Sequence, residues 1–168
     1  MPSSSCPSLP RSARPPTLST TDWQAICQQA QQRGEQLCQT AAGGTQTFLP
    51  QRLGKGSEHH INLRGGLSLT IRQGHLRRPL RYASEHGADF PLVAKFYLSG
   101  SSRVETPNVA NVKSTYEERQ GCHYLYHLPN LTEVEEWPAN ESLQVVYVCV
   151  EPNYFRTFEM GKAAPITS

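Results

Sequence analysis

The sequence predicts a mainly β domain, a barrel or sandwich of antiparallel strands preceded by one short helix. Short β-rich runs alternate with turn signals between Gly121 and Val150, with the turns at 129–130 and 138–140. The run Leu143–Val150 is rich in valine and has the length of a central strand. Apolar residues alternate earlier, at Leu67–Arg72 and Phe90–Leu98, as in half-buried strands.

Length and composition limit the class of protein. The chain has 168 residues, about one domain, with 37% hydrophobic and 18% charged residues. A net charge of +2 is too small to indicate nucleic acid or an anionic membrane as a partner. The largest basic group, Arg72 with Arg77, Arg78 and Arg81, is interpreted as solvated strand ends.

The sequence predicts a cytoplasmic location. No apolar stretch is long enough to cross a bilayer, and the first residues lack the apolar core of a signal peptide. Five cysteines without a C-x-x-C pair argue against a secreted disulfide framework, so we expect reduced thiols.

The N-terminal region is expected to be an arm followed by a helix. Residues 1–19, rich in Pro, Ser and Arg, predict a flexible arm. Thr21 is the predicted N-cap, with Gln24 as its capping-box partner and Gly34 as the stop. The face that carries Trp23 would lie on the barrel or on a partner chain, and the barrel is favoured.

Strands are expected in order along the rest of the chain. They are Thr45–Leu49, a run that begins near His59, Leu67–Arg72 ending at Gln73–Gly74, Arg78–Ala83, Phe90–Leu98 and the runs after Gly121. Ser84–Asp89 is expected to be a loop, and the polar segment Arg103–Tyr116 a weak strand or an exposed loop. Beyond Val150, Pro152 is a plausible first helical residue, with Tyr154, Phe155 and Phe158 capping one barrel end.

The histidines do not predict a metal site. No His-x-His is present, and His59 and His60 would point to opposite faces of a strand. His123 and His127 share a face, but their Cα atoms would be about 13 Å apart. We therefore expect no metal and no cofactor.

The sequence does not indicate an enzyme. Glu133, Glu135 and Trp137 share one face of a predicted strand, and a buried carboxylate beside tryptophan can have a raised pKa. An exposed polar face with an aromatic at its rim is the commoner arrangement. No nucleophilic triad with a local signature is present.

The aromatic residues indicate a ligand pocket. Tyr124 and Tyr126 share a face with Cys122, Phe96 lies on a strand expected to be their neighbour, and Tyr147 shares a face with Cys149. Such an interior suits a small, mostly apolar ligand with a few hydrogen-bonding groups. A fully packed core, in which the hydroxyls reach backbone partners, is the open alternative.

From Leu63 to Phe158 the order of segments resembles the N-terminal regulatory domain of AraC-family transcriptional regulators, particularly the PchR-like branch. The segments that carry the resemblance are Gly66–Ile71, Pro91–Gly100, Tyr124–Pro129, Glu133–Trp137, Leu143–Pro152 and Tyr154–Phe158. The resemblance implies a cupin-like double-stranded β-barrel (jelly roll) that binds an effector and signals to a C-terminal DNA-binding domain. PchR-like members respond to iron–siderophore complexes, so these are the first effector class to test.

These observations lead to one expected organisation. Residues 1–19 form the arm, 20–160 the effector-binding β-barrel domain with its helix, and 161–168 a tail, and the DNA-binding domain is absent from the chain. The hypothesis is an effector-binding, dimerising regulatory domain that reaches DNA only through such a domain. The rival hypotheses are a metal-dependent cupin enzyme and a dimerisation module with a filled barrel. The predicted ligand-binding residues are Phe96, Tyr124, Tyr126 and Tyr147, with His123 or Arg78 at the mouth.

Overall fold

The computed structural model describes residues 14–107, 109–110 and 112–154, which form two sheets, antiparallel except for the pair of β1 (Thr17–Leu18) and β6 (Leu80–His86), and one helix. The seven-stranded sheet has the order β10 (His123–Tyr126), β7 (Leu92–Ser99), β12 (Ser142–Val150), β5 (Leu67–Leu76), β4 (Gly54–Asn62), β3 (Gly44–Phe48) and β2 (Cys38–Ala41). The five-stranded sheet has the order β1 (Thr17–Leu18), β6 (Leu80–His86), β11 (Leu131–Trp137), β8 (Ser101–Glu105) and β9 (Thr115–Arg119). The prediction of a mainly β, jelly-roll-like domain is confirmed, although hydrogen bonds join the described strands into two sheets and not into one closed barrel.

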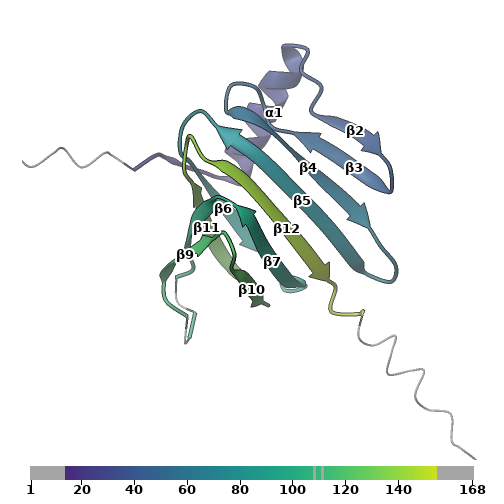
Figure 1. Cartoon of the computed structure of the whole chain (residues 1–168), viewed down its shortest axis with the longest axis vertical. Coiled ribbons are helices and arrows are strands. Elements are labelled where there is room, and N and C mark those ends of the chain that lie inside the picture. The colour runs from purple at the N-terminus through teal and green to yellow at the C-terminus, as the bar shows by residue number, and fades with distance from the viewer. Residues whose placement is uncertain (1–13, 108, 111, 155–168) are drawn as a thin grey trace, which may run out of the picture.

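The two sheets are arranged as layers. In Figure 1 the strands β12, β5 and β7 lie in front of β6 and β11, and β4, β3 and β2 extend the larger sheet to one side. Helix α1 (Thr20–Gln32) lies behind that extension, and it contacts β6. Strand β12 is central, as its valine-rich sequence predicts, because it pairs with β5 on one edge and β7 on the other.

The N-cap of helix α1 lies two residues earlier than the sequence predicts. Its N-cap is Ser19, whose hydroxyl accepts a hydrogen bond from the Asp22 amide, while the Asp22 carboxylate accepts one from the Ser19 amide. This capping box forms in place of the expected pair of Thr21 and Gln24. The Asp22 carboxylate, at the third helical position, also interacts favourably with the positive end of the helix dipole. Trp23 meets Tyr82 of β6 edge to face, with ring centroids 5.8 Å apart, so its face packs on the sandwich as favoured.

Several predicted boundaries are wrong. The expected loop at Ser84–Asp89 is strand as far as His86, because β6 pairs with β11 along its whole length. Strand β5 continues past Gln73–Gly74 to Leu76, opposite β4. The polar segment after residue 100 forms the hairpin of β8 and β9, whose side chains alternate between the interior and solvent.

The turns follow the sequence signals. Asn130 and Asn140 adopt positive φ values of 56° and 64°, in the left-handed region that asparagine tolerates. Gly100 joins β7 to β8 at φ 77°, and a Cβ there would lie 2.9 Å from the Ser142 carbonyl oxygen. Only glycine fits this connection without strain.

The ends of the described chain differ in part from the expectations. Thr17 and Leu18 pair in parallel with β6, so this portion of the expected arm packs on the sandwich. Residues 152–154 form a turn, not the start of a helix, and Phe155 and Phe158 lie outside the described residues. No helix in the described part of the chain has the length and apolar character needed to span a membrane.

The faces of β7 are the reverse of the ligand-pocket prediction. Val93, Lys95 and Tyr97 point into the sandwich, and all three are buried. Phe96 and Leu98 point outward, with Phe96 39% exposed. Both faces of this strand carry apolar side chains, so the pattern alone could not orient it. The inward lysine is stable only because carboxylates surround it.

Candidate functional site

A cavity of about 420 Å³ lies between the two sheets. Strands β6 and β11 form one wall, and β4, β5, β7 and β12 form the other. Its aromatic lining comprises Trp23, Phe48, Tyr82, His86, Phe90, Tyr126, Trp137 and Tyr147. The volume lies within the range of small-molecule sites, and the interior side chains do not fill the sandwich completely.

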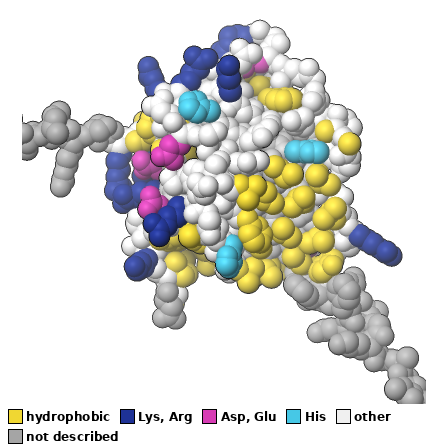
Figure 2. Space-filling view, viewed as in Figure 1, with side chains coloured by type: hydrophobic (Ala, Val, Ile, Leu, Met, Phe, Trp, Pro, Cys, Tyr) yellow, Lys and Arg dark blue, Asp and Glu magenta, His cyan; other side chains and the backbone are white. Residues whose placement is uncertain are grey.

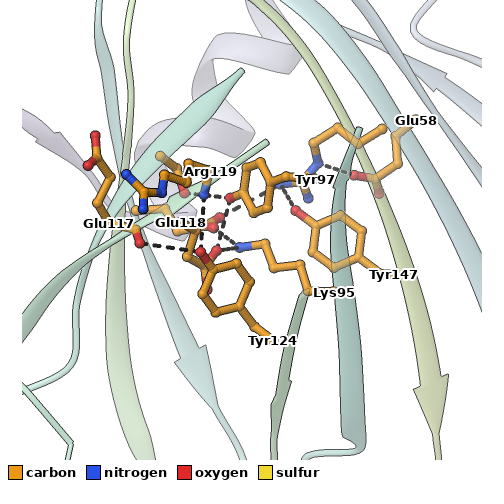
Figure 3. A network of polar contacts seen from close by, with 11 residues as sticks. Glu58, Lys95, Tyr97, Glu117, Glu118, Arg119, Tyr124 and Tyr147 are labelled. Carbon is orange, nitrogen blue, oxygen red and sulfur yellow. Dashed lines mark hydrogen bonds and ion pairs between the residues drawn. The ribbon is translucent and has the colours of Figure 1, made fainter. Parts of the chain in front are cut away.

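Lys95 is the centre of a buried ionic group. Its side chain is 1% exposed, and its ammonium lies 2.5 Å from Glu118 of β9 and also pairs with Glu135 of β11. Tyr97 donates a 2.9 Å hydrogen bond to the same Glu118 carboxylate, and the Ser102 hydroxyl lies 2.5 Å from Tyr97 (Figure 3). These contacts fix the lysine where a buried charge would otherwise be unstable.

The pKa values in this group reflect burial and pairing. Burial raises the pKa of Glu118 despite the nearby lysine. Burial acts in the same direction on Glu135, but Lys95 and Arg72 outweigh it and hold the pKa of Glu135 below its usual value. Burial disfavours the charge of Lys95, yet Glu135 and other groups hold its pKa well above the ordinary value. Lys95 and Glu135 are therefore charged at neutral pH.

Arg72 forms the second ionic group of the cavity. Its Nε donates a 2.7 Å hydrogen bond to Glu58 on β4, and its Nη1 donates one of 3.0 Å to the Tyr147 hydroxyl. The guanidinium lies over the rings of Trp137 and Tyr147, at 4.9 and 5.0 Å from their centroids. Glu135, 3.8 Å from Nη1, links this group to Lys95.

Glu133 differs from the other cavity carboxylates. It is 6% exposed and lines the cavity, yet no hydrogen bond or ion pair from another described residue reaches its carboxyl. Burial, with the charge of Glu135, raises the pKa of Glu133 to about 7. The interpretation of Glu133, Glu135 and Trp137 as an exposed polar face is thus wrong: all three line the cavity. The less common arrangement, a buried carboxylate near tryptophan, is present.

Two of the six predicted ligand residues, Tyr126 and Tyr147, line the cavity. Tyr124 lies on the inner face, but its hydroxyl accepts a 3.2 Å hydrogen bond from the Arg119 amide, which links β10 to β9 (Figure 3). Phe96 and His123 stack on the outer face, with centroids 6.3 Å apart. The positions of these five residues follow from the direction and register of their strands.

Arg78 lies in the exposed connection between β5 and β6, away from the cavity lining. The basic cluster that contained it divides in the structure. Arg77 and Arg78 are exposed, whereas Arg72 lines the cavity and Arg81 is buried on the outer face of β6. The interpretation as solvated strand ends holds for Arg77 and Arg78 but is wrong for Arg72 and Arg81.

Sequence reasoning missed Lys95, Glu118 and Glu58 as residues of the interior. Lys95 is the one charged residue in an otherwise uncharged strand, and Glu118 lies just after Arg103–Tyr116, the segment expected to be a weak strand or an exposed loop. The sequence did contain one signal of this group. A lone lysine in an apolar strand can be matched by carboxylates at alternating positions of another strand. No group of three or more metal-ligating side chains comes together within the described ranges.

The facing sheets and the lined cavity define a cupin-like sandwich, and the comparisons with known proteins add the family. A family model described as "Regulatory protein PchR N-terminal domain" matches residues 54–167, well over half of the chain. The chain belongs to this family and is a regulatory domain. No curated protein matches the sequence.

Solved structures of low similarity include other cupin domains. A Cupin 2 conserved barrel domain protein from Salinispora arenicola is 8% identical with a TM-score of 0.45, over 66% of this chain and 88% of its own. The Cnp3 cupin domain of Schizosaccharomyces pombe is 6% identical with a TM-score of 0.44, over 64% and 73% of the two chains. Because these scores are low, the description of the fold rests on the sheets themselves.

Proposed function

We propose that this domain binds a small-molecule effector in the cavity between its sheets and belongs to a bacterial AraC-family transcription regulator. The observation that carries the proposal is the cavity of about 420 Å³, with aromatic walls and fixed ionic groups, in a domain of a regulatory family. An iron–siderophore complex is the first effector class to test. The domain acts in the cytoplasm and is not an enzyme.

Helix α1 gives an occupant a way to change the rest of the protein. Trp23 lines the cavity and packs against Tyr82, so a ligand would touch the helix directly. The helix connects through Ser19 to β1, which pairs with the edge of β6. Occupation of the cavity would therefore shift α1 and the segment before it. This shift would change how DNA-binding domains attached to this domain are held.

The outer face of the seven-stranded sheet is the proposed site for a second copy of the chain. Figure 2 shows apolar side chains gathered on this face. Phe96 on β7 and Leu125 on β10 are 39% and 69% exposed, and Val146 of β12 is paired with Phe96. A two-fold interface brings equivalent residues together, so a patch without charge avoids like-charge repulsion. Leu125→Glu should reduce self-association in sedimentation experiments, and unchanged association would contradict this interface.

Native mass spectrometry tests the proposed function. The protein is sprayed alone and with ferric siderophores, haem and other small molecules, and a bound species of defined mass is expected. Ser84 lines the cavity, so Ser84→Phe should abolish the bound species by filling the space. Its neighbour Glu85 is exposed, and Glu85→Phe should retain it. Clean spectra for the whole panel, or equal binding by both variants, would overturn the proposal.

A further inference from the structure

The charges that line the cavity are unbalanced. The cations are Arg72 and Lys95, whereas four glutamates line the same space. The glutamates are Glu58, Glu133, Glu135 and Glu141. Glu118, which does not line the cavity, adds a carboxylate to the lysine group. His86 does not alter this balance, because burial lowers its pKa and its Nδ1 lies 2.8 Å from the Leu128 carbonyl oxygen.

Both cations are already paired. The Lys95 ammonium contacts Glu118 and Glu135, and the Arg72 guanidinium contacts Glu58 and Glu135. An anionic ligand would have to compete with these carboxylates for each cation, and it would also meet the negative charge of the lining. Such competition is unfavourable, because it separates each cation from its carboxylate partners.

Glu133, by contrast, has unused capacity to accept hydrogen bonds. It is 94% buried, it lines the cavity, and no described donor reaches it. A buried carboxyl without a donor is less stable than one with a partner, and a ligand can supply that partner. Aromatic rings of Tyr126 and Phe90 line the same cavity, and such faces also attract cations.

We propose that the cavity is selective for a small organic cation, a primary or secondary ammonium on an aromatic or apolar body, with the ammonium paired to the Glu133 carboxylate. This inference rests on the proposed function and narrows its effector class. The aromatic walls pack on the body of the ligand, while Lys95 and Arg72 hold Glu58 and Glu135 in place. An iron complex would fit only if it presented a cationic group.

The pairing makes binding dependent on pH. Glu133 must lose its proton to pair with an ammonium, and burial has raised its pKa to about 7. The affinity for a cation should therefore increase as pH rises from about 6 to about 8. At the lower end of this range, binding of the cation should release the proton from Glu133. The charges of Glu135, Lys95 and Glu118 affect the pKa of Glu133. The charge of Glu133 in turn affects the pKa values of Tyr116 and Tyr126.

Three probes that share a para-hydroxyphenyl body and differ in the terminal group, and so in charge, test the inference by isothermal titration calorimetry. Tyramine is a cation, para-ethylphenol its neutral counterpart and para-hydroxyphenylpropionate its anionic counterpart. Tyramine should bind at least about ten-fold more tightly than para-ethylphenol, because a charge-assisted hydrogen bond is stronger than no bond. The anion should bind most weakly, and only the tyramine affinity should rise with pH.

Two matched variants locate the effect. Glu133→Gln should reduce tyramine to the affinity of para-ethylphenol without changing para-ethylphenol binding, whereas Glu85→Gln, at an exposed position, should change neither. Equal or tighter binding of the neutral or anionic probe to the wild type would overturn the cation selectivity while leaving the cavity as a small-molecule site. No binding by any probe at millimolar concentration would overturn it too. The proposed function is overturned by the outcomes of the native mass spectrometry instead, which are clean spectra for the wider panel or equal binding by Ser84→Phe and Glu85→Phe.

Discussion

Two ionic groups lie on opposite faces of the sheet that contains β6 and β11, and they are satisfied to different degrees. On the outer face, the Arg81 guanidinium contacts Glu105 at 3.0 Å and Glu136 at 2.9 Å, and its Nε donates to the Thr17 hydroxyl. On the inner face, Lys95 contacts two glutamates, but a further carboxyl beside them, Glu133, has no donor among the described residues.

This difference distinguishes an ionic group that stabilises the fold from one that can bind a ligand. The Arg81 group joins β1, β6, β8 and β11, and each of its members has a partner, so its effect is to hold the strands together. The Lys95 group has the same chemistry but leaves a carboxyl open to a cavity. Complete pairing stabilises a fold, whereas an unpaired, buried acceptor beside empty space provides a place for a ligand.

Removing the inner cation should have the largest effect. Lys95→Met leaves Glu118 and Glu135 buried without their common partner, so the free energy of unfolding should fall by about 3–5 kcal/mol. Denaturant titrations at neutral pH measure this loss. Adding Glu118→Gln to Lys95→Met should recover part of the lost stability. If Lys95→Met were as stable as the wild type, the inner group would not be an ionic group.

The open carboxyl should make stability depend on pH. The folded state holds the Glu133 proton more tightly than the unfolded state, with the pKa raised from 4.5 to about 7. Stability should therefore fall as pH rises between these values, by about 3 kcal/mol in total. Glu133→Gln should remove this decline when unfolding is followed from about pH 5 to about pH 8. Parallel pH profiles for wild type and variant would contradict the assignment, and Glu85→Gln serves as the control.

Removing the outer cation should cost less. Arg81 is buried, but Glu105 and Glu136 keep about a quarter of their side-chain surface exposed, so water replaces part of the lost pairing. Arg81→Met should lower the unfolding free energy by about 2 kcal/mol. It should leave the binding of tyramine unchanged in calorimetry. A cost equal to that of Lys95→Met, or a change in binding, would remove the distinction between the two groups.

The smallest effect is expected at the rim of the cavity. Glu58 pairs with Arg72, but its side chain is 35% exposed, and solvent screens the pair. Glu58→Gln should change the unfolding free energy by about 0.5 kcal/mol or less in denaturant titrations. A loss as large as that for Lys95→Met would mean that the two ionic groups of the cavity act as one unit.

The sequence predicted the architecture better than the site. The turns at Asn130 and Asn140 and the central position of β12 were predictable, because they depend on local turn chemistry and β propensity. The start of the helix was predictable to within two residues, because Ser19 and not Thr21 caps it.

The site depended on contacts between distant strands. Lys95 pairs with Glu118 and Glu135, which follow it by more than twenty residues, and a lysine is normally assigned to the outer face when its partners are unknown. That assignment placed Phe96 inside, when the inward positions of β7 belong to Val93, Lys95 and Tyr97. Tyr126 and Tyr147 were predicted to line the pocket, and both are in the cavity lining.

A direct measurement of the Glu133 carboxyl would test the central claim. Carbon-detected NMR of side-chain carboxyls, assigned with Glu133→Gln, reports the titration of this group with and without tyramine. We expect Glu133 to titrate at about pH 7 in the free protein and at a clearly lower pH when tyramine is bound. Titration at the usual value for glutamate, unchanged by tyramine, would contradict both the buried open carboxyl and its pairing with a ligand cation.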